Sequence, residues 1–125
     1  MKQLLLVGVG GFIGSILRYL ISKLNLSWHF LSLPMGTLTV NIAGSFIIGL
    51  LVGISARSEV ISPDLRLLLV VGFCGGFTTF SSFSNENLAL LQNGQIATVL
   101  IYTVMSITLG FLAVYLGYES GNHLL

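Results

Sequence analysis

The chain has 125 residues, of which five are basic, four are acidic and 54% are hydrophobic. A soluble domain carries a charge on roughly a quarter of its residues, so this composition excludes a water-soluble globule and indicates an integral membrane protein. A net charge of +1 argues against a nucleic-acid partner. Because a membrane-spanning helix needs about 20 apolar residues, the length accommodates four spans and no additional soluble domain.

We predict an all-α protein with four transmembrane helices joined by short polar connections. The first connection contains Trp28, a side chain suited to the membrane interface. The third span begins with a helix-capping signal, Ser62 followed by Pro63, and Asn93-Gly94 predicts a tight turn before the fourth span. The predicted spans cover about residues 3–23, 35–56, 65–92 and 95–118.

The first predicted span has two other interpretations. A cleaved signal peptide would explain Met1-Lys2 before an apolar run, but no small-residue cleavage site follows. The glycines between Gly8 and Gly14 imitate a dinucleotide-binding turn, but their spacing is one residue too long and no acidic ribose partner follows. We therefore predict a transmembrane helix in which Gly10-x-x-x-Gly14 marks close contact with another helix.

Basic residues are distributed almost evenly between the two sides of the membrane. With four spans, Lys2, Arg57 and Arg66 lie on one side, whereas Arg18 and Lys23 lie close to the other. Lysines and arginines in loops set the orientation of a membrane protein, so this small imbalance specifies the orientation only weakly. We therefore expect a dimer of two oppositely oriented copies.

The third predicted span is not uniformly apolar. The pair Gly75-Gly76 is followed by threonines and serines between residues 78 and 84 and by polar residues 85–87. Glycine weakens a helix, and hydroxyl side chains compete for its backbone hydrogen bonds. We predict a helix broken near its middle, which is tolerated at membrane depth only where it is buried or lines a cavity. A kinked helix that only packs on its neighbours is the alternative.

Three phenylalanines in the same segment recur every third residue, at Phe77, Phe80 and Phe83. This spacing places the rings along one side of a helix. Such a stripe commonly packs against lipid or a neighbouring helix. The functional alternative is that the positive ring edges face an anion, because weak ligands allow an ion to leave a conducting path.

Polar residues spaced by four mark one face of the second span and one face of the fourth. The second span carries Thr37, Asn41 and Ser45, and the fourth carries Tyr102 and Ser106. Asn41 is the most informative, because an amide in hydrocarbon must be paired and its NH₂ group can donate to an anion. The sequence leaves two roles open for Asn41, a hydrogen bond between helices and a donor to a transported anion.

Arg18 and Glu86 are the permanent charges that lie away from the ends of the predicted spans. Arg18 lies near a helix end, where it either snorkels to the surface or makes an electropositive vestibule that attracts anions. The sequence assigns no role to Glu86. His29 and His123 lack metal-ligand spacing, and no nucleophile–base pair is present, so we expect no enzymatic activity.

Three motifs, in the first three predicted spans, carry a resemblance to a known family. They are Gly11-x-x-Gly14-x-x-x-Arg18-Tyr19, Gly36-Thr37-x-x-x-Asn41-x-x-Gly44-Ser45-Phe46 and Gly72-Phe-Cys-Gly75-Gly76-Phe-Thr-Thr79-Phe80-Ser81-x-Phe83-Ser84. In order, spacing and chain length they resemble the Fluc (CrcB) fluoride channels of microbes. The resemblance implies an antiparallel, dual-topology homodimer in the cytoplasmic (inner) membrane, with two pores that export fluoride passively.

The resemblance also implies roles for individual residues. It places the main-chain carbonyls of Gly75 and Thr78 around a structural Na⁺ at the dimer centre. Tyr102 and Ser106 would form a polar track, and the next position along it is Gly110, where relatives often have a hydroxyl residue. The implied fluoride path contains ring edges and hydrogen-bond donors, namely Thr37, Asn41, Phe80, Ser81, Ser82, Phe83, Tyr102 and Ser106.

Two other functional classes are open to a chain of this size. Small multidrug transporters also have four spans and form antiparallel dimers, but they use a glutamate in the first span, where this chain has no acidic residue. A structural subunit without transport activity would not require polar residues in the middle of the third span. The prediction is therefore a fluoride-selective channel, with fluoride as the transported ion and membrane lipid as its surroundings.

Overall fold

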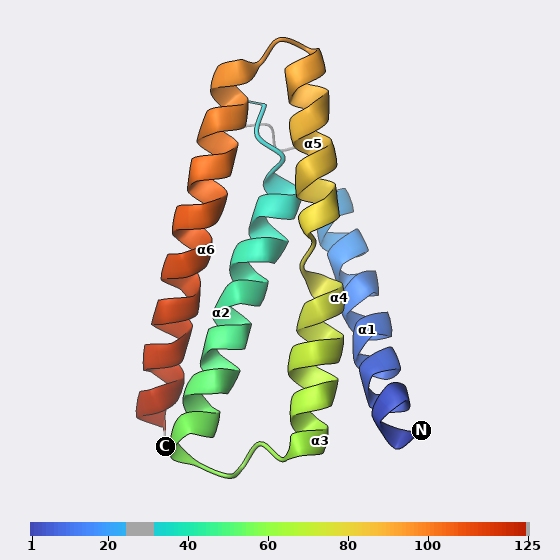
Figure 1. Ribbon diagram of the computed structural model, residues 1–125, viewed down its shortest axis with the longest axis vertical. Helices are drawn as coiled ribbons and strands as arrows, with labels where there is room; N and C mark the ends of the chain where they lie inside the picture. Colours follow the sequence, from blue (N-terminus) through green and yellow to red (C-terminus); the bar gives the residue numbers. More distant parts are fainter. Residues whose placement is uncertain (25–31, 125) are drawn as a thin grey trace.

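The structure is a computed structural model, and its described residues are 1–24 and 32–124 (Figure 1). The predicted interfacial residue Trp28 and the neighbouring His29 lie outside the described residues. The described chain consists of helices joined by short turns and connections. The helices are α1 (Lys2–Leu24), α2 (Met35–Arg57), α3 (Pro63–Arg66), the π-helix η2 (Leu67–Cys74), α4 (Gly75–Phe77), α5 (Phe80–Gln92) and α6 (Ile96–Leu124).

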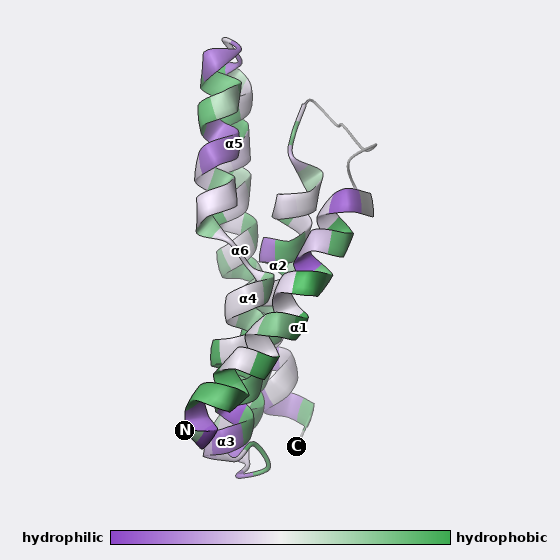
Figure 2. Ribbon diagram, turned by 90° about the vertical axis from the view of Figure 1, so that its right-hand side faces the viewer, coloured by the Kyte–Doolittle hydropathy of each residue, from purple (hydrophilic) through white to green (hydrophobic). Residues whose placement is uncertain are grey.

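Four helical stretches are long and apolar enough to cross a membrane. Three of them are α1, α2 and α6, and the other runs from Pro63 to Gln92 through α3, η2, α4 and α5. The prediction of an all-α membrane protein with four spans is confirmed. Figure 2 shows apolar ribbon along much of these helices, with polar residues near the ends and along α5.

The connection from α2 to α3 and the connection from α5 to α6 lie at opposite ends of the bundle (Figure 1). At one end, Lys2 Nζ lies 2.6 Å from Asp64 Oδ2, which joins α1 to the start of α3. Ser62 Oγ accepts a hydrogen bond from the backbone N–H of Leu65 (3.1 Å), so the predicted helix cap is confirmed. At the other end, Gly94 has a φ of 74°, a left-handed conformation that glycine adopts without strain, and it forms the predicted turn.

Glycines bring the backbones of α2 and α6 into direct contact. A Cβ atom at Gly49 of α2 would lie 2.1 Å from the carbonyl oxygen of Val114 in α6. In return, a Cβ atom at Gly117 of α6 would lie 2.2 Å from the carbonyl oxygen of Phe46 in α2. Small residues allow such close approach between membrane helices, so this pair forms a tightly packed half of the bundle.

The glycines of α1 make a similar contact with the third span. A Cβ atom at Gly10 would lie 2.2 Å from the carbonyl oxygen of Leu68, and one at Gly14 would lie 2.2 Å from that of Phe73. The close helix contact predicted from Gly10-x-x-x-Gly14 is confirmed. This contact fixes α1 against η2 and α4, directly before the polar part of the third span.

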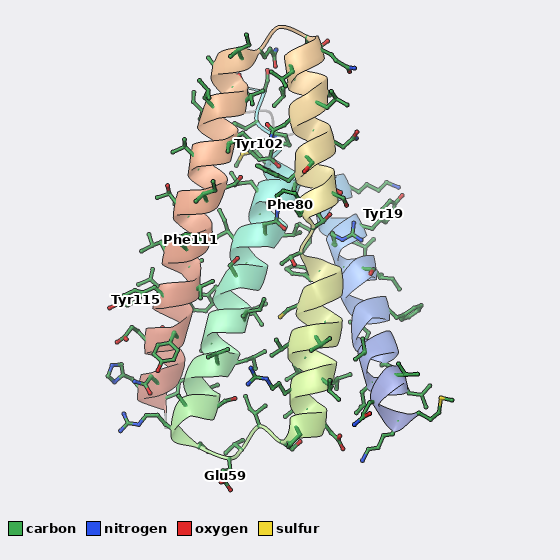
Figure 3. All side chains as sticks on the ribbon, viewed as in Figure 1. Tyr19, Glu59, Phe80, Tyr102, Phe111 and Tyr115 are labelled. Atoms are coloured by element: carbon green, nitrogen blue, oxygen red, sulfur yellow. The ribbon has the colours of Figure 1, made fainter. Side chains whose placement is uncertain are left out.

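The buried core and the outer surface lie on different faces of the helices. Buried Leu33, Leu38, Leu90 and Tyr102 form a cluster where α2, α5 and α6 meet. On the outside of α6, Phe111 and Tyr115 are exposed and point away from the bundle (Figure 3). Apolar side chains on the outer surface are expected where the solvent is lipid.

Candidate ion path at the interrupted third span

Helical geometry is interrupted between α4 and α5. Thr78 (φ −91°, ψ 161°) and Thr79 (φ −154°, ψ 124°) are extended, and helical geometry resumes at Phe80. The Thr78 hydroxyl donates to the carbonyl of Cys74 (2.9 Å), and the Thr79 hydroxyl accepts from the backbone N–H of Ser82 (3.2 Å). One threonine thus bonds back to the preceding helix, and the other caps the next.

Both polar atoms of the Asn41 side-chain amide, on α2, form hydrogen bonds with the backbone at the interruption. Its Nδ2 donates to the carbonyl of Thr79 (3.0 Å), and its Oδ1 accepts from the backbone N–H of Thr79 (2.8 Å). The side-chain amide therefore replaces the helical partner that an extended residue lacks. Of the two roles left open by the sequence, the hydrogen bond between helices is present. The NH₂ group has a second hydrogen, which is available to another acceptor.

Arg18 of α1 binds the end of α4. Its Nε donates to the carbonyl oxygen of Gly76 (2.9 Å), and the side chain is half-buried. A cation is stabilised at a helix C-terminus, where carbonyl groups lack partners. Across residues 1–24 and 32–124, no hydrogen bond to the carbonyl of Gly75 or Thr78 is present. Those two oxygens are the ones that the family resemblance implies as Na⁺ ligands.

Two adjoining hollows lie beside the interruption, and both are lined by Asn41, Ser45 and Phe80. The first, which we call the threonine hollow, has a volume of about 260 Å³. The second, the phenylalanine hollow, has a volume of about 180 Å³. The threonine hollow is completed by Ile48, Thr78 and Thr79, and the phenylalanine hollow by Phe83, Ser106, Ile107 and Gly110. Together they form an apolar surface with a few amide and hydroxyl groups.

The phenylalanine stripe divides into two environments. Phe77 is buried and stacks on Phe73, with ring centroids 5.4 Å apart. Phe80 and Phe83 border the phenylalanine hollow, and their centroids are 5.8 Å apart with the rings tilted by 41°. Phe80 exposes 78% of its surface at the start of α5 (Figure 3). Phe77 therefore has a packing role, whereas the other two rings lie beside the polar groups.

Glu86 links α5 to both neighbouring helices. Its Oε2 accepts from the Thr37 hydroxyl of α2 (2.6 Å), and its Oε1 accepts from the Tyr102 hydroxyl of α6 (2.7 Å). Tyr102 is fully buried, points from α6 toward α5 (Figure 3) and packs on Phe83 with ring centroids 4.9 Å apart. The carboxylate is therefore paired with two hydroxyl donors, as a charge inside a membrane protein requires.

The membrane-spanning region matches a known family along almost its whole length. The family model described as CrcB-like protein, Camphor Resistance (CrcB), matches residues 5–118. The chain belongs to the CrcB family. The resemblance predicted from the three sequence motifs is confirmed.

Relatives from several bacteria support the assignment. A protein of Gloeothece citriformis is 51% identical over 118 residues, which cover 94% of each chain. A protein of Methylobacillus flagellatus is 45% identical over 95% of this chain and 94% of its own. A protein of Azobacteroides pseudotrichonymphae is 44% identical over 94% of each chain. Each of these relatives is named Fluoride-specific ion channel FluC.

The structure brings some of the predicted path residues together and separates others. Ser106 lies with Asn41 and the two rings at the phenylalanine hollow, and Gly110 lines the same hollow without offering a hydroxyl. Ser81 is exposed, with its Oγ 3.3 Å from that of Thr79. Ser82 and Arg18 both bind groups next to the interruption. The backbone N–H of Ser82 donates to the Thr79 hydroxyl, and Arg18 donates to the carbonyl of Gly76 in α4. The roles of these residues in ion conduction stay predictions.

Three residues take a larger part in this region than the sequence predicts. Ser45 lines both hollows, and its spacing of four from Asn41 is the signal that identifies it. Thr79 is the backbone partner of Asn41. Glu86 follows Phe83 at the same spacing of three that relates the phenylalanines, which indicates the same side of α5. That spacing could have predicted Glu86 beside the rings.

Proposed function

We propose that this chain forms a passive, fluoride-selective channel in the cell membrane. Its family and the names of its relatives support a fluoride channel, and the family is one of ion channels rather than enzymes. The observation that carries the proposal is the set of groups around the two hollows. One amide, two serine hydroxyls and two phenyl rings converge there beside an interrupted membrane helix.

The chemistry of these groups suits fluoride. Fluoride is the smallest halide and the strongest hydrogen-bond acceptor among them, so a narrow path of hydroxyl and amide donors replaces its water better than that of chloride. Ring edges carry partial positive charge and contact an anion weakly. Arg18 donates its Nε–H to the carbonyl of Gly76 and is not among the residues that line the two hollows. A path without a strong fixed cation allows the ion to leave.

Passive conduction gives the channel its physiological direction. Fluoride that accumulates in the cytoplasm flows outward down its own gradient, so export needs no coupled proton or sodium movement. The absence of any acidic residue from α1 supports this proposal over proton-coupled exchange.

The active form in this proposal is an antiparallel homodimer. The basic residues support it, because Lys2 and Arg57 lie at one end of the bundle and Lys23 lies at the other. The exposure of Phe80 also supports it, since this ring borders the phenylalanine hollow but is uncovered in a single copy. A second, inverted copy would enclose the hollows and complete a path through the membrane.

A structural Na⁺ at the centre of that dimer is the other part of the proposal. The carbonyls of Gly75 and Thr78 would hold it, and two oxygens from each copy would supply four ligands. Carbonyl oxygens suit a hard cation. The fit is supported by the absence of hydrogen bonds to these two oxygens in the described ranges. Of the two carbonyls between them, that of Gly76 is bound by Arg18. The ion would stabilise the interruption and would not be transported.

Fluoride efflux from liposomes tests the function directly. Purified protein is reconstituted into vesicles loaded with potassium fluoride, a potassium ionophore balances charge, and a fluoride electrode records release. We expect rapid fluoride release that does not require a pH gradient, and no comparable release of chloride from matched vesicles. Release that requires proton exchange would indicate a coupled transporter, and vesicles that retain fluoride would refute the channel.

A further inference from the structure

The carboxylate of Glu86 uses hydrogen-bond donors that the ion path itself would need. The hydroxyls of Thr37 and Tyr102 each have one hydrogen, and both hydrogens point at Glu86 over distances of 2.6 and 2.7 Å. While those bonds exist, neither hydroxyl can donate to another anion. The carboxylate therefore occupies a binding site made of two hydroxyl donors, which we call the hydroxyl site.

The hydroxyl site adjoins the phenylalanine hollow. The ring of Tyr102 packs on that of Phe83, with centroids 4.9 Å apart, and Phe83 lines the hollow. Ser106, one helical turn beyond Tyr102 on α6, lines the hollow as well. An anion that leaves the hollow along this face of α6 thus meets hydroxyl groups already bound to a carboxylate.

We propose that Glu86 is an internal competitor that regulates the binding of fluoride at this end of the path. This inference rests on the proposed fluoride channel. Fluoride and the carboxylate are both anionic acceptors, so they compete for the same two hydrogens. A hydroxyl hydrogen changes partner by rotating about its C–O bond, and the Thr37 and Tyr102 side chains can therefore remain in place. Glu86 holds the donors when no ion is near and yields them as fluoride arrives.

The competitor differs from two simpler roles that Glu86 could have. If Glu86 only holds α2, α5 and α6 together, its loss weakens the fold and does not tighten fluoride binding. If Glu86 acts only through its negative charge, its loss tightens binding whether or not the two hydroxyls are present. Of the three roles, only competition for hydrogens requires the tightening of fluoride binding to depend on Thr37 and Tyr102.

A double-mutant comparison separates the three roles. Fluoride binding is measured in detergent from the rise of the unfolding temperature with sodium fluoride concentration, fitted for a dissociation constant Kd because the stabilisation grows as RT ln(1 + [fluoride]/Kd). Sodium chloride keeps the ionic strength constant. The variants are Glu86→Met, the pair Thr37→Val with Tyr102→Phe, and all three changes together. Methionine keeps most of the side-chain length but accepts no strong hydrogen bond. Gel filtration checks that each variant is folded.

We expect Glu86→Met alone to lower the Kd for fluoride about tenfold, which corresponds to about 1.4 kcal/mol. In the background that lacks both hydroxyls, the same substitution should change it less than twofold. Equal tightening in both backgrounds, or no tightening in either, would overturn the competitor. If Glu86→Met does not yield folded protein, Glu86→Leu, which also accepts no hydrogen bond, is measured in the same two backgrounds against the same criterion. Fluoride efflux by the unmodified protein is recorded separately, so a failed channel is distinguished from a failed competitor.

Discussion

Substitution of Asn41 by leucine tests whether its amide holds the interruption between α4 and α5. Leucine has a similar size and shape, so the change removes the two hydrogen bonds to Thr79 without leaving a large cavity. Those bonds measure 3.0 Å and 2.8 Å, and both involve backbone groups of one extended residue. The Thr79 N–H would lose its only partner among the described residues.

The expected loss of stability follows from those two bonds. A fully buried donor left without a partner costs about 1–3 kcal/mol, and the Thr79 N–H, which is half-buried, falls in the lower part of that range. The net loss of the second bond adds about 1 kcal/mol, so we expect Asn41→Leu to lower the free energy of unfolding by about 2–3 kcal/mol. Ser45→Ala is the matched control, because Ser45 lies one turn further on the same face of α2 and makes no hydrogen bond within the described ranges. Its effect should be below about 0.5 kcal/mol.

The assay is unfolding of the purified protein in detergent, followed by the fluorescence of a dye that reacts with Cys74, which is buried in the folded chain. Fluoride efflux from liposomes is measured for the same variants. A leucine variant as stable as the alanine control would refute the reasoning, because the Asn41–Thr79 bonds would then contribute nothing. A leucine variant of normal stability and lost flux would instead assign Asn41 to the ion alone.

Four further outcomes are expected. Phe80→Ile and Phe83→Ile should each lower fluoride flux by about tenfold, equivalent to about 1.4 kcal/mol. The control Phe77→Ile should leave fluoride flux intact and lower the free energy of unfolding by less than about 1.5 kcal/mol. Equal flux in all three variants would contradict a role for the ring edges. Gly14→Ala should lower stability by about 1–3 kcal/mol in the same unfolding assay, because the added Cβ would lie 2.2 Å from a backbone oxygen of η2. Several lysines added to the 58–62 loop should bias the orientation in which the chain inserts, measured by labelling from one side of the membrane. They should also reduce fluoride flux until a copy with the opposite bias is co-expressed. Full activity of one uniform orientation would exclude the antiparallel dimer. Fluoride flux should be the same with and without a Na⁺ gradient across the liposome, and sodium that moves in a fixed ratio with fluoride would refute a structural Na⁺.

Local sequence was sufficient for the features that depend on neighbouring residues. Ser62 caps its helix and Gly94 forms its turn, and the partners in both cases lie within a few positions. The hydroxyls of Thr78 and Thr79 likewise bond to backbone groups four and three residues away, but the backbone of Thr79 is also held by Asn41 from another helix. The π-helical geometry of η2 is different, since its leucines and valines carry no signal that distinguishes it from an α-helix.

The hydrogen-bond partners of the polar side chains could not be predicted from neighbouring residues in the sequence. Arg18 binds Gly76 across 58 residues, Thr37 binds Glu86 across 49, and Asn41 binds Thr79 across 38. Each of these bonds depends on the height and rotation of one helix relative to another. Helical spacing shows which face a residue occupies, but it does not show which neighbour that face meets.

Composition and length were enough to predict the class of protein and the number of spans, because lipid requires each crossing segment to be apolar and to satisfy its own backbone hydrogen bonds. It also identified the family, since the motif glycines and polar residues are read directly from the chain. The partners of Glu86 could be found only from the packing of the helices, because its two hydroxyl donors come from α2 and α6. Close contact of α2 with α6 and the position of α5 between its neighbours place the Thr37 and Tyr102 hydroxyls on opposite oxygens of one carboxylate.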